Sequence, residues 1–91
     1  IEMIQKFVAD HYSLKISELK AKNNSKSVAV PRQIAMYLTK SLTGASLPEI
    51  GKEFGGKHHS TVIHSIRKID DLRKQNPDFD RLIHSFVQAF R

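Results

Sequence analysis

The chain has 91 residues, which is enough for one domain with a small core and too few for a multi-domain enzyme. Its lack of cysteine excludes a disulfide framework and a thiolate zinc site, and no apolar run approaches membrane-spanning length. Fifteen lysines and arginines against nine acids give a formal net charge of +6, which favours a polyanionic partner.

Residues 1–27 predict two helices followed by a loop. The first helix, which fades near Tyr12 and Ser13, has an apolar side that we expect to join the core: Ile1, Ile4, Phe7 and Val8. The second helix is short and is predicted by three further apolar residues: Leu14, Ile16 and Leu19. Residues 20–27 (Lys-Ala-Lys-Asn-Asn-Ser-Lys-Ser) have no periodicity, so we expect a polar basic loop there. That loop is a candidate contact for phosphate or for the minor groove.

A long third helix is predicted to begin near Ser27 and to end at Gly44. Ser27 is a suitable N-cap, and Pro31 would lie in the first turn, where a missing backbone N–H costs little. Gly44 is a natural stop at the C-terminal end. The buried stripe is predicted to consist of Val30, Ile34, Leu38 and Leu42. The side opposite this stripe is predicted to carry Arg32, Gln33 and Lys40.

The centre of the chain has the pattern of a helix-turn-helix. Residues 46–49 (Ser-Leu-Pro-Glu) form a capping-box pattern with a proline in the first turn, at the start of a helix that reaches Phe54. The pair Gly55-Gly56 supplies a tight turn, because glycine tolerates positive φ. The next helix, which we expect to end near Lys74, has apolar residues at spacings of four, three and three: Val62, Ile66, Ile69 and Leu72. Its first turn is polar and basic, which suits entry into the major groove.

A sixth helix is predicted near the end of the chain. Asn76 is a suitable N-cap, Pro77 follows at the first helical position, and Asp78 is favourable to the helix dipole. Its apolar residues form the most regular amphipathic pattern in the chain: Phe79, Leu82, Ile83, Phe86, Val87 and Phe90. No segment alternates as a strand does. We therefore predict an all-α fold, a compact bundle of about six helices that contains a helix-turn-helix.

The excess positive charge lies in the middle of the chain. Residues 19–69 contain nine basic residues and two acids, a net charge of +7, whereas the two ends together contain six basic residues and seven acids. Residues 19–48 contain no acid at all. A basic segment that coincides with a predicted helix-turn-helix is typical of a nucleic-acid-binding surface.

Three blocks of sequence carry a family resemblance. Residues 54–62 (Phe-Gly-Gly-Lys-His-His-Ser-Thr-Val), followed by Lys68 and Ile69, resemble the signature of the C-terminal DNA-binding domain of the bacterial replication initiator DnaA family. Residues 27–38 and 46–51 resemble the same family in the same order. The resemblance implies a Trp-repressor-related helix-turn-helix fold. Because the chain begins at Ile1 rather than Met, we expect residues 1–91 to be one domain of a longer initiator protein.

The resemblance implies sequence-specific binding of double-stranded DNA at the DnaA box, a short asymmetric site. Such binding would anchor an initiator at the replication origin, with transcription regulation as a further role. In the family, the residues matching His58, His59 and Ser60 reach base edges in the major groove, and the residue matching Pro48 touches a thymine methyl. The residue matching Asn24 enters the minor groove. Phosphate contacts are expected from Lys57, Thr61, Lys26, Arg32, Gln33, Lys40 and Lys22.

Two of these positions depart from the family pattern. Many members have Asp where this chain has His58. Asp caps a helix and accepts a hydrogen bond from cytosine, whereas a neutral imidazole is expected to cap poorly and can offer guanine a donor. At the position of Asn24 the family often has an arginine. Asparagine can read a groove edge without bringing charge, so Lys22 or Lys26 is expected to do part of that work.

Catalysis and metal binding are both disfavoured by the sequence. Spacings of five and six residues do not align His58 and His59 with His64 as the i, i+4 pair of a helical zinc site. Ser60 and His64 have no orienting acid, so a nucleophile and base are not predicted. For His64 two roles remain as alternatives: a DNA contact, or an ordinary exposed histidine. We expect no cofactor in this chain, and the resemblance implies that ATP binds an upstream domain of the longer protein.

The expected partner is double-stranded DNA in the bacterial cytoplasm, at the nucleoid. A monomer is predicted because the implied site is asymmetric, and the full-length protein is expected to self-assemble at the origin through other domains. Acidic phospholipids are candidate partners as well. The open alternative is a basic helical interaction module that binds an acidic protein or anionic lipid. Dependence of affinity on DNA sequence would separate the two hypotheses.

Overall fold

The computed structural model describes residues 1–90, and every regular element in that range is a helix. The six helices are α1 (Glu2–His11), α2 (Ile16–Lys20), α3 (Lys26–Leu42), α4 (Leu47–Glu53), α5 (His59–Gln75) and α6 (Pro77–Ala89). The predicted all-α fold with a helix-turn-helix, α4 and α5, is confirmed. None of the helices in residues 1–90 is long and apolar enough to cross a membrane.

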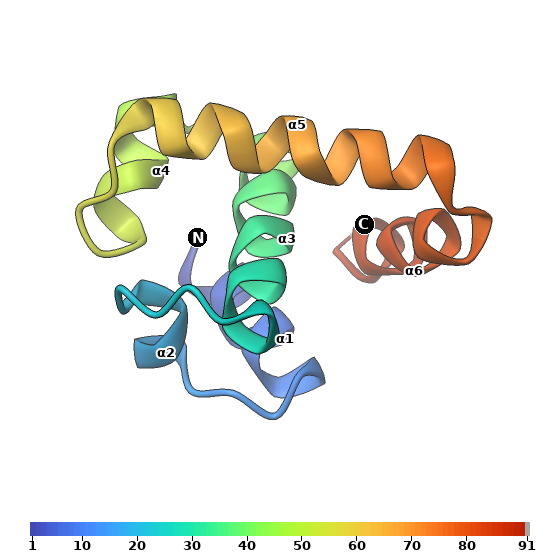
Figure 1. Ribbon diagram of the computed structural model, residues 1–91, viewed down its shortest axis with the longest axis horizontal. Coiled ribbons are helices and arrows are strands. Elements are labelled where there is room, and N and C mark those ends of the chain that lie inside the picture. Colours follow the sequence, from blue (N-terminus) through green and yellow to red (C-terminus); the bar gives the residue numbers. More distant parts are fainter. Residues whose placement is uncertain (91) are drawn as a thin grey trace.

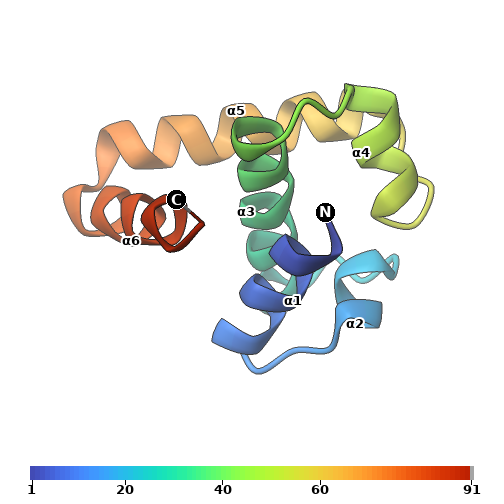
Figure 2. The ribbon, with the colours of Figure 1, turned by 180° about the vertical axis from the view of Figure 1, so that it is seen from behind.

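Helix α3 forms the centre of the bundle. Helix α5 crosses one end of α3, with α4 packed against one half of α5 and α6 against the other (Figure 1). Helices α1 and α2 pack against α3 away from that crossing, as the view from behind also shows (Figure 2). The recognition-type helix α5 is therefore held along its length by three neighbours, which leaves its N-terminal end at the edge of the molecule.

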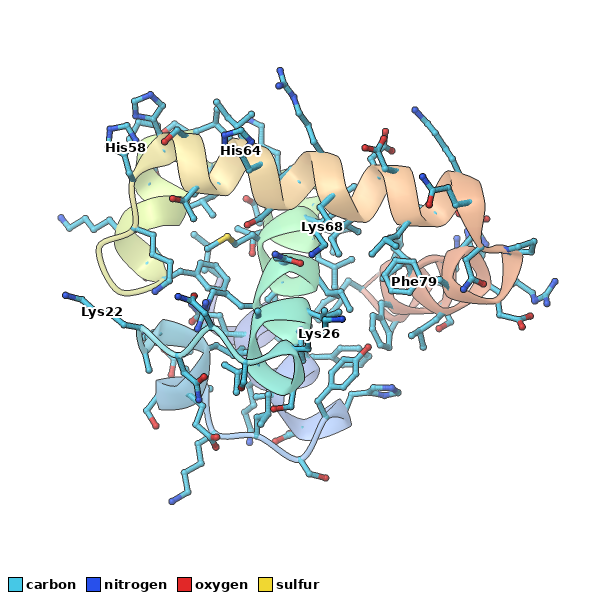
Figure 3. All side chains as sticks on the ribbon, in the orientation of Figure 1. Lys22, Lys26, His58, His64, Lys68 and Phe79 are labelled. Carbon is cyan, nitrogen blue, oxygen red and sulfur yellow. The ribbon has the colours of Figure 1, made fainter. Side chains whose placement is uncertain are left out.

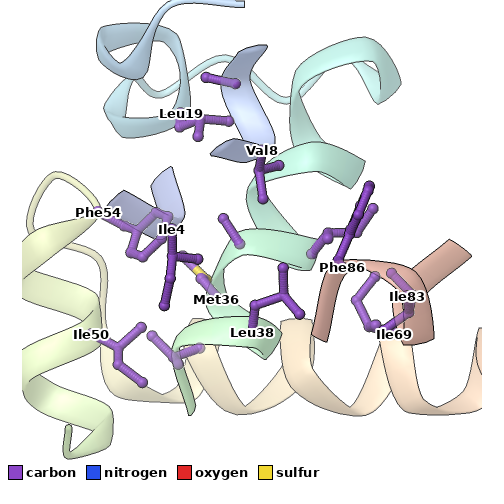
Figure 4. Packing of buried hydrophobic residues seen from close by; sticks show 14 of the residues in the cluster. Ile4, Val8, Leu19, Met36, Leu38, Ile50, Phe54, Ile69, Ile83 and Phe86 are labelled. Carbon is purple, nitrogen blue, oxygen red and sulfur yellow. The ribbon is translucent and has the colours of Figure 1, made fainter. Parts of the chain in front are cut away.

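The core is built from the apolar stripes of all six helices (Figure 4). Ile34 and Leu38 of α3 have no exposed surface, and the same holds for Val62 and Ile69 of α5. Phe54 closes the end of α4 and is also fully buried. The apolar residues that the amphipathic patterns placed on the inward sides are all buried or packed against the core, as expected because burial of these stripes is the main favourable term in folding.

The start of α3 differs from the prediction. Its N-cap is Ser25, and the helix begins at Lys26, so Ser27 lies inside the first turn. Pro31 is therefore the sixth residue of the helix and is buried, rather than a first-turn proline. The missing N–H of Pro31 removes the helical hydrogen bond to the carbonyl of Ser27, close enough to the end for the helix to continue.

The turn between α4 and α5 forms as the double glycine predicts. The capping box is present, with the Ser46 Oγ accepting a hydrogen bond from the Glu49 backbone N–H at 3.3 Å. Gly55 and Gly56 both have positive φ, 88° and 75°. A Cβ atom on Gly55 would lie 2.1 Å from the carbonyl oxygen of Lys20, so glycine also permits the turn to approach the end of α2.

Helix α6 closes the bundle on the side away from the turn. The Asn76 Oδ1 accepts hydrogen bonds from the backbone N–H groups of Asp78 and Phe79, which confirms the predicted N-cap. Arg73 of α5 donates to the Asp80 carboxylate at 2.6 Å and to the Tyr37 hydroxyl at 2.9 Å. These two hydrogen bonds join α3, α5 and α6 at one point.

Candidate nucleic-acid interface

The first turn of α5 presents a row of polar side chains. His59, Ser60 and Thr61 are exposed, whereas the next residue, Val62, is fully buried. Helix α5 is thus anchored by one apolar side, and its N-terminal polar residues extend away from the core. Figure 3 shows His58 at the end of α5, at the same edge of the molecule as Lys22.

His58 is the N-cap of α5. Its Nδ1 accepts a hydrogen bond from the backbone N–H of Ser60 at 3.1 Å and lies 2.7 Å from the Ser60 Oγ. The expectation that histidine caps this helix poorly is therefore wrong, because the extended backbone of His58 turns the ring back over the first turn. The rings of His58 and His59 lie against each other, tilted by 31°, with a centroid separation of 4.2 Å.

Lys57 connects the turn to the basic loop. Its Nζ donates to the carbonyl oxygens of Phe54 at 2.8 Å, Lys20 at 3.2 Å and Ala21 at 3.2 Å. Three carbonyls match the three donors of an ammonium, so the Lys57 donors are used inside the domain. Partial burial lowers the pKa of the Lys57 ammonium, and the nearby positive charges of Arg32 and Lys22 lower it further.

Arg32 is not opposite the buried stripe of α3, as predicted, but is itself only 5% exposed. Its Nε donates to the carbonyl of Leu19 at 2.9 Å, and its Nη2 donates to those of Ala21 at 2.9 Å and Asn23 at 2.6 Å. The predicted exposed position of Arg32 is therefore wrong, because the helix pattern did not account for the loop that folds over this side. Burial lowers the pKa of this guanidinium. The side chain holds the loop in place.

The remaining predicted contacts lie in the basic loop and on α3 and α4. Three of them, Lys22, Asn24 and Lys26, are exposed in the loop and at the start of α3, and Figure 3 labels the two lysines. Pro48 is exposed in the first turn of α4, and Lys40 is exposed with its Nζ 3.3 Å from the carbonyl of Ala45. Gln33 is half-buried, and its Oε1 has no hydrogen-bond partner within residues 1–90. Their roles toward DNA stay predictions.

Sequence reasoning missed one supporting residue, Gln5 on α1. The Gln5 side chain is 1% exposed, and its Nε2 donates to the carbonyl of Glu53 at 2.9 Å. This hydrogen bond satisfies a carbonyl at the C-terminal end of α4, where helical partners run out. A polar residue between Ile4 and Val8, on the apolar side of α1, was the available signal.

The described part of the chain contains no pocket and no group of three His, Asp or Glu side chains suited to hold a metal ion. The candidate site is therefore a convex surface: the polar first turn of α5, the first turn of α4 and the basic loop that Lys57 and Arg32 hold beside them. Together with the fold, this surface defines a helix-turn-helix domain, the class of protein that presents one helix end to the major groove of DNA.

A family profile described as "Bacterial dnaA protein helix-turn-helix" matches residues 1–69. The chain belongs to this family. It is 57% identical over 91 residues to the chromosomal replication initiator protein DnaA of Geobacter metallireducens and 49% identical over 90 residues to that of Zymomonas mobilis. The chain spans 19% of the length of each of these relatives and so corresponds to one part of them.

Two solved structures contain a similar domain. One, described as the crystal structure of a DNA replication initiation factor, has a TM-score of 0.87 and 37% identity; the match covers 97% of this chain and 27% of that one. The other, the replication initiator DnaA bound to AMPPCP and single-stranded DNA, has a TM-score of 0.84 and 37% identity and covers 98% of this chain and 27% of that one. These relatives support DNA binding in replication initiation as the role of the domain.

Proposed function

We propose that this domain binds double-stranded DNA sequence-specifically at DnaA boxes and so anchors a replication initiator at the origin. The observation that carries the proposal is that two exposed polar elements, the first turn of α5 and the loop at 22–26, are joined at one edge. Lys57, just before α5, joins them by donating to the carbonyls of Lys20 and Ala21, which directly precede the loop. The α5 turn suits the major groove, and the loop suits an adjacent minor groove.

Base reading is assigned to His59, Ser60 and His58, with Pro48 against a thymine methyl and Asn24 in the minor groove. Imidazole and hydroxyl groups both donate and accept hydrogen bonds, which lets them distinguish base edges. Phosphate contacts are assigned to Thr61 at the start of α5, where backbone N–H groups favour an anion, and to the exposed lysines Lys22, Lys26 and Lys40, with Gln33 beside them. Arg32 and Lys57 act by holding the loop.

The longer protein would supply what this domain lacks. ATP binding is assigned to a domain outside this chain, as is self-assembly at the origin, and the domain itself is proposed to be a monomer without cofactor. Binding at promoters, and hence a role in transcription, follows from the same box recognition. Such a protein would act in the bacterial cytoplasm, at the nucleoid. Acidic phospholipids stay candidate partners, and vesicles that contain them would test that role separately.

The test is a fluorescence-anisotropy titration with a duplex that carries one DnaA box and with a scrambled duplex, at two salt concentrations. We expect a preference for the box of at least about a thousandfold, with both affinities falling as salt rises. Equal affinities for the two duplexes would reject sequence-specific recognition, and no binding to either would reject the DNA role.

The variant His59→Ala separates base reading from phosphate binding. It should cost about 1–3 kcal/mol on the box and little on the scrambled duplex, because base edges distinguish the two DNAs. Lys40→Ala is the matched control and should weaken binding to both duplexes alike, since a phosphate contact carries no sequence information. Equal losses on both duplexes for His59→Ala would remove its base-reading role.

A further inference from the structure

We infer that the helix cap locks His58 in one ring tautomer, with Nδ1 unprotonated and Nε2–H pointing outward, so that His58 selects a guanine edge and rejects a cytosine edge at one position of the box. This inference rests on the proposed duplex binding for its second half only. The tautomer itself is a property of the free domain.

The hydrogen bond from Ser60 decides the tautomer. A backbone N–H is always a donor, and the one on Ser60 lies 3.1 Å from the His58 Nδ1, so Nδ1 must act as the acceptor. The Ser60 Oγ lies 2.7 Å from the same nitrogen, and a hydroxyl can donate to it as well. A proton on Nδ1 would break the hydrogen bond from the backbone N–H, because two donors would then face each other, although that proton could still be donated to the Ser60 Oγ. The neutral ring therefore carries its proton on Nε2.

The direction of Nε2 follows from the same geometry. The two nitrogens flank Cε1, and their outward directions in the ring plane diverge widely, so a ring whose Nδ1 faces the first turn of α5 directs Nε2 away from it. Within residues 1–90 no hydrogen bond to Nε2 is present, and the side chain of His58 is exposed. The ring of His59, 4.2 Å away and tilted by 31°, restrains one side of the His58 ring.

A single outward donor distinguishes bases that present acceptors from bases that present donors. Guanine presents two acceptors, N7 and O6, in the major groove, whereas cytosine presents the N4 amino donor. A donor at Nε2 is therefore favoured by guanine and opposed by cytosine. An aspartate at the same position would also cap the helix but would turn a second acceptor outward, which reverses this preference.

The tautomer is tested first, without DNA. Two-bond proton–nitrogen correlation spectra of the 15N-labelled domain, at mildly alkaline pH, distinguish a ring protonated on Nε2 from one protonated on Nδ1. The signals of His58 are assigned by their absence from the His58→Asn variant. We expect the Nε2–H pattern for His58; a proton on Nδ1 would overturn the inference.

Base selection is tested with a matched pair of variants. Asparagine and aspartate have the same shape and cap helices equally well, but the outward atom is a donor in His58→Asn and an acceptor in His58→Asp. Duplexes that differ at a single base pair are titrated at each box position. The wild type and His58→Asn should prefer guanine at one position by about 5–150-fold, and His58→Asp should prefer cytosine there.

The possible outcomes separate this inference from the proposed function. If both variants prefer the same base, or if the changes in preference spread over several positions, base selection by His58 is overturned while box binding stands. If the wild type itself has no preference among duplexes, both the proposed function and base selection are overturned.

Discussion

At the scale of single residues, the carbonyl of Lys20 marks a close backbone approach at the interface. This oxygen accepts a hydrogen bond from Lys57 and also lies where a Cβ on Gly55 would be, 2.1 Å away. Gly56 has a similar positive φ, but a Cβ there would meet nothing within 4 Å. The two glycines therefore differ in what they are needed for: Gly56 supplies backbone conformation, and Gly55 supplies both conformation and space.

This difference predicts unequal losses of stability. Gly56→Ala should lower the free energy of unfolding by about 1–2 kcal/mol, the cost of a left-handed backbone for a residue with a Cβ. Gly55→Ala should lower it by about 1–3 kcal/mol more, because the loop must shift to relieve the contact with backbone. Urea unfolding followed by circular dichroism gives both values. Equal losses for the two variants would contradict the steric argument.

At the scale of elements, Arg32 and Lys57 tie three segments together. Both donate to the carbonyl of Ala21, Arg32 from α3 and Lys57 from the turn before α5. The loop that carries Asn24 is thus connected to the helix-turn-helix by the buried side chain of Arg32 and the half-buried side chain of Lys57. A loop held this way stays aligned with the first turn of α5, which is what reading two adjacent grooves requires.

The variant Arg32→Met tests this connection. It leaves the carbonyls of Leu19 and Asn23 without their donor and that of Ala21 with Lys57 alone, so we expect a loss of about 1–3 kcal/mol in the free energy of unfolding. We also expect faster trypsin cleavage after Lys22 and Lys26 under native conditions, because the loop is released.

Lys40→Met is the control for that experiment, since its Nζ makes one long hydrogen bond, 3.3 Å, to the Ala45 carbonyl at an exposed site. It should change neither stability nor cleavage of the loop by much. Wild-type cleavage rates in Arg32→Met would show that Arg32 does not hold the loop.

At the scale of the whole molecule, the excess positive charge is concentrated in the central segment of the chain. The net charge of +7 in residues 19–69 is close to the whole net charge of +6. Several basic residues outside this segment are paired with acids, as Lys6 is with Asp10 and Arg81 with Asp78. Long-range attraction should therefore orient the domain before any base is read.

Salt dependence measures how many phosphates this surface contacts. The double variant Lys22→Ala/Lys26→Ala should reduce the slope of log affinity against log salt by about 2, one for each lost contact, on both box and scrambled duplexes. Lys6→Ala/Arg81→Ala removes the same charge from α1 and α6 and should leave the slope unchanged. Equal reductions for the two double variants would mean that only net charge matters.

The sequence alone determined the features that depend on local periodicity and end signals. The apolar stripes predicted six helices and their inward sides, the Ser46 capping box and the Asn76 cap placed two helix starts, and the double glycine placed the turn. These signals work because helix geometry and capping are properties of short segments. The family resemblance, carried by residues 54–62, was likewise contained in the sequence and is confirmed.

Only the tertiary structure decided which polar residues face solvent. Arg32 and Lys57 have the charge of phosphate ligands, yet both donate to carbonyls of a loop that is distant in sequence, and the single Gln5 inside α1 does the same for α4. Ser25 rather than Ser27 is the N-cap of α3, and His58 caps α5 through the backbone N–H two residues further on. Unlike these local caps, the hydrogen bonds of Arg32, Lys57 and Gln5 join segments whose proximity arises only when the core packs, so no local pattern could reveal them.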